Sequence, residues 1–166
     1  ENVIGLESGL GKGFYFQMAG FENGRLQTAA RAVGVMQAAY EAAYDHAHNR
    51  NVFGKNISEY QLTRVKLGRM AVLIQAGRQF GYQVARLMAK GEGTTEASMV
   101  KAYVCKAAEW VSREAMQIHG GYGYSKEYEI ERLYREAPML LIGEGTADIQ
   151  RMIIARRLLE DYKIRT

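Results

Sequence analysis

A single carboxylate between two glycines, in the stretch IGEGTADIQR at residues 142–151, is the first place where this sequence offers chemistry. Glu144 comes directly before a segment that predicts a helix, and two interpretations compete. In the first, it is a carboxylate near the positive end of a helix, which stabilises the helix by about 0.3–1 kcal/mol. In the second, it is a general base, because the flanking Gly143 and Gly145 leave room beside it for a ligand.

Two other stretches place polar residues or glycines where long helices are expected to end. In RNVFG, Arg50 follows a predicted helix, where a cation suits the negative helix end. A planar guanidinium is equally suited to gripping a diphosphate, and Phe53 either covers an aromatic ring or fills the core. In QIHGGYGY, residues 117–124, the paired glycines are most simply a C-cap and turn. This stretch is not a dinucleotide fingerprint, because it closes a helix and no strand precedes it.

Several other chemistries find little support in the composition. The pair His46 and His48 matches neither a helical metal pair nor a zinc motif, so no metal site is expected. We predict that both are solvated and that His119 belongs to a turn. The single Cys105 excludes an internal disulfide and fits a reducing compartment. The net charge is +4, but the basic residues are scattered without interleaved aromatics, so nucleic acid is not an expected partner. No apolar run is long enough for a membrane span.

The elements that must position these residues are long helices, because the 166 residues contain one proline and 48% apolar residues. Ser58 opens one helix in a capping-box pattern with Gln61, and Thr94 or Thr95 is placed to cap another. The stretch ENGR is expected to lead into the first helix. The predicted helices cover residues 25–48, 58–90, 96–119, 127–136 and 146–163.

Apolar residues recur at alternating steps of three and four in these segments, the spacing of one buried helix face. The stripes are Met70, Leu73, Gly77, Phe80, Val84 and Leu87; Val104, Ala108, Val111, Ala115 and Ile118; and Met152, Ala155, Leu159 and Tyr162. Since no alternating strand pattern appears, we predict an all-α fold, an antiparallel up-down four-helix bundle with long helices. Gly68, Gly77 and Gly81 each cost about 1 kcal/mol inside a helix, which predicts close approach of a neighbouring helix or ligand.

Taken together, the breaks between helices resemble the C-terminal helical domain of the acyl-CoA dehydrogenase family of flavoproteins, over essentially the whole chain. The matching segments are ENVIG…GLGKGFYFQMAGFENGR (1–25), NRNVFGKNISEYQ (49–61), AMQIHGGYGY (115–124), ERLYREA (131–137) and GEGTADIQRMIIARRLLEDY (143–162), in the family's order and spacing. Complete members also have an N-terminal helical domain and a middle β-domain. The resemblance therefore implies that residues 1–166 are a single helical-bundle domain, the C-terminal part of a longer flavoenzyme, which is not expected to be active alone.

The resemblance implies FAD-dependent α,β-dehydrogenation of an acyl-CoA to the trans-2-enoyl-CoA. A Glu at the position of Glu144 removes the α-proton in the family, while a hydride leaves the β-carbon for FAD. Some relatives carry the base directly before the residue that matches Arg25, but this chain has Gly24 there. Many relatives have Tyr where this chain has Gly143, which leaves its preference for straight acyl chains in doubt.

The resemblance also assigns binding roles. Arg50 is expected to grip the FAD diphosphate, and Asn23, Arg25 and Gly145 to contact the substrate. The remaining cofactor-binding residues implied are Phe53, Tyr60, Gln61, Thr146 and Asp148, with Gln117, Gly120 and Gly121 reaching FAD from a neighbouring subunit. A homodimer or homotetramer, an electron-transfer flavoprotein as electron acceptor, and the bacterial cytoplasm or mitochondrial matrix follow as expectations.

Two alternatives stay open at this point. An acyl-CoA oxidase or related flavin oxidase on the same scaffold would return electrons to oxygen instead of a protein partner. A non-catalytic helical oligomerisation domain would be expected to lack the base or the Arg, and this chain has both Glu144 and Arg50.

Overall fold

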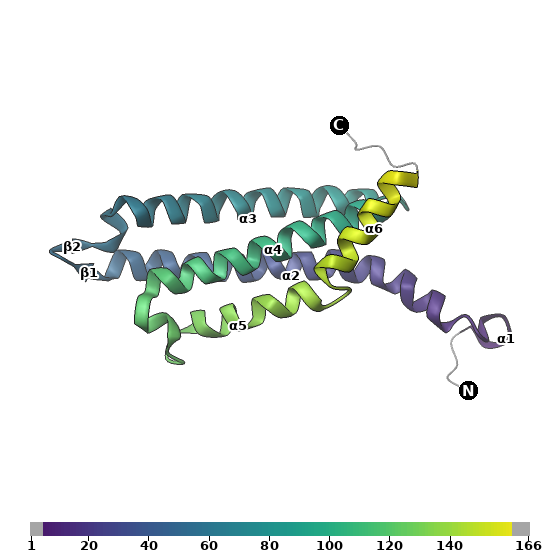
Figure 1. Ribbon diagram of the computed structural model, residues 1–166, viewed down its shortest axis with the longest axis horizontal. Coiled ribbons are helices and arrows are strands. Elements are labelled where there is room, and N and C mark those ends of the chain that lie inside the picture. Colours follow the sequence, from purple (N-terminus) through teal and green to yellow (C-terminus); the bar gives the residue numbers. More distant parts are fainter. Residues whose placement is uncertain (1–4, 161–166) are drawn as a thin grey trace.

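The computed structural model describes residues 5–160 and consists almost entirely of helices (Figure 1). The elements are α1 (Leu6–Gly9), α2 (Gly13–Asn49), β1 (Asn51–Val52), β2 (Lys55–Asn56), a 3-10 turn (Ile57–Glu59), α3 (Gln61–Met88), α4 (Thr94–His119), a second 3-10 turn (Gly120–Tyr124), α5 (Glu129–Ile142) and α6 (Ala147–Glu160). No helix among these residues is long and apolar enough to cross a membrane.

The helices α2, α3, α4 and α5 alternate in direction, which confirms the predicted up-down bundle (Figure 1). Helix α4 lies at the centre and packs against α2, α3, α5 and α6. The core face of α2 is built from small side chains, which allow close approach of its neighbours, and that of α4 from valines and alanines. The buried residues of these two faces include Ala29, Ala32, Ala39, Ala43, Val100, Val104, Ala108 and Val111.

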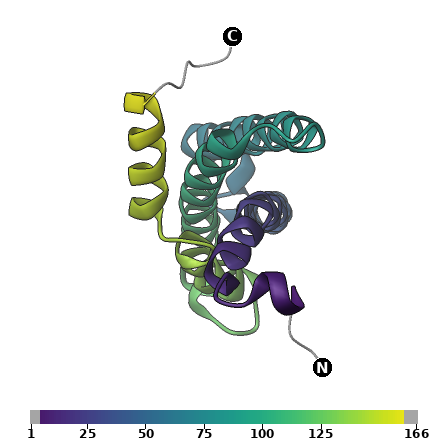
Figure 2. The same cartoon turned by 90° about the vertical axis from the view of Figure 1, so that its right-hand side faces the viewer.

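The fourth member of the bundle is α5, and not the last helix of the chain, which crosses α4 outside the bundle (Figure 2). The predicted stripe on that last helix is correspondingly wrong as a core face. Met152 and Leu159 are 66% and 88% exposed, Tyr162 lies outside the described residues, and the buried residue of α6 is Gln150. The stripes on α3 and α4 face the core as predicted: Met70, Gly77 and Val84 on α3 and Val104, Ala108, Val111 and Ala115 on α4 are buried, and the other members are half-buried.

Two helix boundaries differ from the prediction by more than three residues, because tertiary contacts override local signals. Helix α2 begins at Gly13, so residues 22–25 lie inside it; Thr94 donates to Glu22, and Arg25 is buried against Ser98, both on α4. Helix α5 continues through Pro138 to Ile142, since Ala137 and Leu140 extend its buried face while the proline lies on the exposed side.

The connection between α2 and α3 contains a small antiparallel hairpin, Asn51 opposite Asn56, that the sequence did not predict. Its strands have two residues each, too short for an alternating pattern. Both loop residues have positive φ, 53° at Phe53 and 83° at Gly54, as a tight hairpin turn requires. The capping box here is formed by Asn56 with Glu59, and not by Ser58.

The helix that follows the GEGTT break is capped by backbone alone. Helix α4 begins after Gly93, which has φ 91°, without a side-chain cap from Thr94 or Thr95. Of the three glycines predicted to allow close approach of a helix or ligand, Gly77 is the one that contacts a neighbouring helix. A Cβ atom there would lie 3.3 Å from Val104, whereas Gly68 and Gly81 have open space.

Candidate functional site

Glu144 lies in the short link between α5 and α6, and its carboxylate rests on α2. A Cβ atom added to Gly24 would lie 2.5 Å from Oε2 and 2.6 Å from Cδ of Glu144. The two positions, far apart in the chain, therefore share one space, and the absence of a side chain at Gly24 is what admits the carboxylate. Glu144 itself is half-buried and has φ 56°, an unfavourable conformation for a residue other than glycine.

Two buried cations flank this carboxylate. Arg25, one residue after Gly24, is 9% exposed, and its Nη1 donates to the buried hydroxyl of Ser98 at 3.3 Å. Within residues 5–160 its Nε has no hydrogen-bond partner. Burial lowers the pKa of Arg25, while Glu22 and Glu144 raise it. Arg25 also lines a cleft of about 490 Å³ between α2 and α6, with Glu22, Thr94, Ile153, Arg156 and Arg157 among the other walls.

The second cation, Lys101 on α4, is completely buried. Its Nζ donates to the backbone carbonyls of Leu141 at 3.0 Å and Gly145 at 2.6 Å. Burial lowers the pKa of Lys101, Arg25 lowers it further, and Cys105 and Glu144 raise it. Burial raises the pKa of Cys105 to about 11, so this thiol is uncharged at neutral pH.

A buried amide side chain, that of Gln150, also bonds the α5–α6 link. The Nε2 of Gln150, on α6, donates to the carbonyls of Glu144 at 2.9 Å and Gly145 at 3.4 Å. Sequence analysis missed both Lys101 and Gln150. A signal existed for Lys101, because it lies three and seven residues before Val104 and Ala108 on the buried stripe of α4. Gln150 carries no comparable signal, since the apolar stripe predicted for its helix points elsewhere.

Four more of the predicted residues lie near Glu144. Asn23 is exposed on α2, one residue from Gly24, and Gly145 has φ 96°. The hydroxyl of Thr146 accepts from the Ile149 N–H at 3.4 Å, and Asp148 is exposed and ion-paired with Arg151 at 2.6 Å. The start of α6 therefore presents polar groups to solvent beside the half-buried Glu144.

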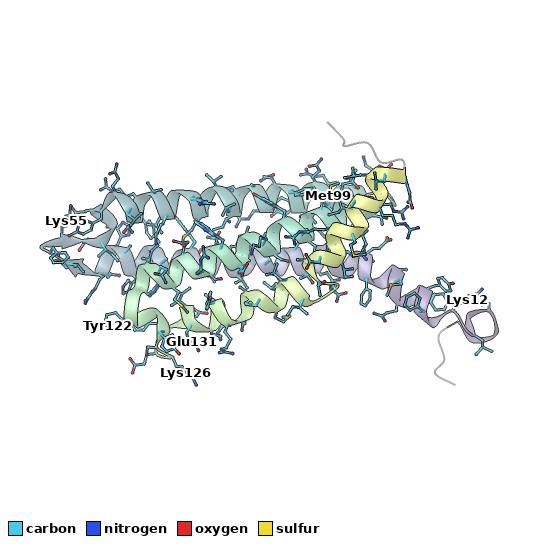
Figure 3. All side chains as sticks on the ribbon, in the orientation of Figure 1. Lys12, Lys55, Met99, Tyr122, Lys126 and Glu131 are labelled. Carbon is cyan, nitrogen blue, oxygen red and sulfur yellow. The ribbon has the colours of Figure 1, made fainter. Side chains whose placement is uncertain are left out.

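The other seven predicted residues gather at the opposite end of the bundle. They are Arg50, Phe53, Tyr60, Gln61, Gln117, Gly120 and Gly121. Figure 3 shows Lys55 and Tyr122 marking this end, while Met99 lies beside α6 at the other. From residue 25 to residue 50, α2 rises by about 37 Å at about 1.5 Å per residue. A single FAD molecule cannot contact both groups in one copy of the chain.

The residues at the hairpin end suit a phosphate-bearing ligand that approaches from outside. The Arg50 side chain is exposed, and its guanidinium lies 5.4 Å from the Tyr122 ring centroid. Gly120, with φ 60°, and Gly121 are exposed and have open space where a Cβ would be, so a ligand can reach their backbone. Phe53 is 94% exposed and fills no core; Tyr60 donates to the Val52 carbonyl at 2.7 Å.

The histidines were predicted incorrectly at two of three positions. His48 is exposed as expected, but His46 is half-buried and stacks on the buried His119 with ring centroids 4.4 Å apart. His119 ends α4 and its Nδ1 bonds the Ala115 carbonyl at 2.8 Å. Burial lowers the pKa of both imidazoles. Residues 5–160 contain no group of His, Cys, Asp and Glu side chains arranged for a metal ion.

The chain is a long antiparallel helical bundle with a carboxylate in the link between its last two helices. These two features can be compared with those of known proteins. The family model described as "Acyl-CoA dehydrogenase, C-terminal domain" matches residues 11–159. The chain therefore belongs to the acyl-CoA dehydrogenase family, as its sequence motifs indicated.

The relatives are considerably longer than this chain. It is 43% identical over 159 residues to an acyl-CoA dehydrogenase of Bacillus subtilis, covering 95% of this chain and 41% of that protein. It is 40% identical over 161 residues to the caffeyl-CoA reductase-Etf complex subunit CarC of Acetobacterium woodii, covering 96% and 42%. Butyryl-CoA dehydrogenase from Megasphaera elsdenii superposes with a TM-score of 0.88 at 37% identity, covering 90% and 39%. The chain spans about two fifths of these proteins.

Proposed function

We propose that this chain contributes the proton-abstracting base of a flavin-dependent acyl-CoA dehydrogenase, and that Glu144 is this base. The observation that carries the proposal is the placement of its carboxylate over Gly24, between α2 and the α5–α6 link. Family members that carry an acid at position 24 instead would put a carboxylate in the same space. Among the acids of this chain, Glu144 therefore occupies the sequence position of the family's base. Its carboxylate also lies in the space that an acid at position 24 would fill.

The surroundings of Glu144 suit the removal of a proton from the α-carbon of an acyl thioester. The carboxylate is half-buried, so it is partly shielded from water, and it can still reach a ligand. Arg25 and Lys101 attract it electrostatically and oppose its displacement. Asn23 and the backbone of Gly145 lie beside it and are proposed to contact the substrate near its thioester, where developing negative charge needs donors.

FAD, when bound, supplies the acceptor for the hydride that leaves the β-carbon. Two groups of this chain are proposed to hold it. Thr146 and Asp148, next to the base, contact the FAD of the same subunit. Arg50, with Phe53, Tyr60, Gln61, Gln117, Gly120 and Gly121, serves the diphosphate and adenosine of the FAD bound to a neighbouring subunit. The separation of about 37 Å along α2 supports this division and hence a homodimer or homotetramer.

The exposed apolar side chains support the proposal that this is one domain of a larger enzyme. Phe14 and Tyr15 near the start of α2 are 69% and 71% exposed, and Leu159 on α6 is 88% exposed. Large apolar side chains exposed in this way are available for contacts with another domain or subunit. An N-terminal helical domain and a β-domain, as in complete family members, would supply such contacts in a bacterial cytoplasmic or mitochondrial matrix enzyme.

The second candidate function is that of a reductase, which differs from a dehydrogenase in the direction of electron flow. The name of the relative CarC describes an acyl-CoA reductase that works in an Etf complex. We infer an electron-transfer flavoprotein as partner here too, with electrons leaving the flavin in a dehydrogenase and entering it in a reductase. An oxidase on the same scaffold would instead react with oxygen. Rapid reoxidation of the reduced holoenzyme by air in a stopped-flow experiment would therefore contradict both Etf-linked functions.

The central test uses the full-length holoenzyme and a panel of acyl-CoAs, beginning with butyryl-CoA and its branched and longer analogues. We expect substrate to bleach the flavin of the parent enzyme. Glu144→Gln should retain FAD and bind the acyl-CoA but reduce the flavin about 10²–10⁴-fold more slowly, the usual contribution of a general base. Bleaching by this variant at the parental rate would show that the base is elsewhere. The panel itself identifies the acyl group, which residues 5–160 do not define.

A further inference from the structure

The backbone of Glu144 is held in a conformation that it would not adopt by itself. Its φ of 56° lies in the left-handed region, and Gly145 follows with φ 96°. A non-glycine residue in this region costs roughly 1–3 kcal/mol and persists only where surrounding structure over-determines it. The link between α5 and α6 contains no helix or strand that could hold this backbone conformation. The restraint on Glu144 must therefore come from side chains outside the link.

Lys101 supplies the first restraint. Its ammonium group bridges the carbonyls of Leu141, before Glu144, and Gly145, after it. The Leu141 carbonyl belongs to the last turn of α5, where helix carbonyls lack intrahelical partners and favour a cation. A fully buried ammonium is expensive to desolvate, and α4 carries this one at a position where an apolar residue would fit its stripe. The two carbonyls are what compensate for that cost.

Gln150, on α6, supplies the second restraint. Its Nε2 donates to the carbonyl of Glu144 itself and to that of Gly145. The Gln150 side chain is fully buried, and a Cβ atom at Gly145 would lie 2.6 Å from this nitrogen. Gly145 is therefore the residue that lets the amide approach the backbone closely. Together the side chains of Lys101, on α4, and Gln150, on α6, bond the carbonyls of Leu141, Glu144 and Gly145.

We propose that Lys101 and Gln150 are positioning residues that lock the α5–α6 link, so that the carboxylate of Glu144 is held over Gly24 in the geometry for proton abstraction. The inference rests on the proposed function of Glu144 and extends it to two residues that do not touch the substrate. The physical reason is that a base displaced by about 1 Å can lose about 10²-fold in rate. Without the bonds to Lys101 and Gln150, the backbone at Glu144 is free to relax to negative φ and carry the carboxylate away.

The test compares Lys101→Met and Gln150→Leu in the full-length holoenzyme by single-turnover reduction of the flavin with butyryl-CoA. We expect the rate per bound flavin to fall about 10–100-fold in each variant. The apparent Kd from the concentration dependence should change less than about threefold, because neither side chain contacts the ligand. The rate should remain sensitive to α-deuteration of the substrate, because the slowed step is proton removal.

A matched control separates positioning from general loss of stability. Val111→Ala also removes a fully buried side chain of α4, but Val111 lies ten residues from Lys101 and away from the link. It should lower the melting temperature and leave the rate per bound flavin unchanged. Lys101→Arg keeps a donor and a positive charge and should recover part of the rate lost in Lys101→Met. If Lys101→Met yields no holoenzyme, Gln150→Leu alone decides the question.

The outcomes distinguish this inference from the proposed function. If Glu144→Gln abolishes bleaching while Lys101→Met and Gln150→Leu reduce flavin at the parental rate, the positioning role is wrong and Glu144 remains the base. A slower rate accompanied by loss of the α-deuterium effect would also overturn it, since proton removal would no longer be the affected step. If Glu144→Gln itself retains full activity, the proposed function fails first.

Discussion

The two ends of the bundle each carry predicted site residues, but these residues differ in how deeply they are buried. At the α6 end, Glu144 is flanked by buried cations, and hydrogen bonds from its own chain fix the backbone around it. At the hairpin end, Arg50, Phe53 and the glycines at 120 and 121 are exposed. The first arrangement is pre-organised within one chain, as chemistry on a bound substrate requires. The second is open, as expected of a surface that another molecule completes. Substitutions should therefore affect catalysis at one end and cofactor affinity at the other.

The substitution expected to affect this comparison most fills the space occupied by the carboxylate of Glu144, the proposed base. Gly24→Ala places a Cβ 2.5 Å from the Glu144 carboxylate, which is the flexible end of a side chain and has to move. We expect flavin reduction to slow by about 10²-fold. Stability should not fall in parallel, because replacing a helical glycine by alanine contributes up to about 1 kcal/mol. Rate per bound flavin and Tm are the two measurements.

Gly34→Ala is the control for this substitution, since Gly34 lies on the same helix with nothing within 4 Å of its would-be Cβ. It should raise Tm and leave the rate unchanged. Equal rates in the two variants would mean that the position of the carboxylate over Gly24 has no catalytic importance.

A smaller effect, of a different kind, is expected at the hairpin end. Arg50→Ala in the full-length enzyme should weaken FAD binding about 10–100-fold, the range for losing a charge-assisted contact of about 1.5–3 kcal/mol. The Tm of the isolated chain should stay constant, since the exposed guanidinium contacts only the Tyr122 ring among the contacts described for it. FAD affinity is measured by flavin fluorescence titration of the apoenzyme. Arg31→Ala, an exposed arginine in the middle of α2, should change neither quantity.

The smallest expected effect concerns the stacked imidazoles beneath Arg50. Burial lowers the pKa values of His46 and His119, and the charges of His119 and Arg50 lower the pKa of His46 further. Below about pH 6.5 the unfolded chain therefore binds more protons than the folded one, and the folded state loses stability as pH falls. Above that pH both states are neutral at these rings and the effect vanishes.

Thermal unfolding of this chain at pH 7.5, 6.5 and 5.5 tests the sign. We expect Tm to drop by about 2–4 °C toward pH 5.5 because of these rings. The double variant His46→Gln with His119→Gln should show a shallower slope over this window. His48→Gln, at an exposed position, serves as the control and should keep the parental slope. An unchanged slope in the double variant would show that the buried pair does not control acid stability.

Much of this architecture could be predicted from periodicity alone. The stripes on α3 and α4 lie in the core as expected, because residues that repeat every three or four positions share one helix face whatever their neighbours are. The predictions failed where that rule does not apply. The stripe on α6 is exposed, since an apolar face identifies a surface to be covered but not the molecule that covers it. Phe53 in the hairpin and Glu144 both have positive φ without being glycine or asparagine, the residues that usually signal this conformation.

The sequence by itself determined the helices, their antiparallel order and a family in which an acid at position 144 has a defined role. Only the tertiary structure decided that the carboxylate lies over Gly24, that Lys101 and Gln150 bond the link around it, and that the predicted FAD residues separate into two distant groups. The physical reason is that helix formation depends on neighbours within four residues. The geometry of a site depends instead on packing between residues far apart in the chain, which no local spacing encodes.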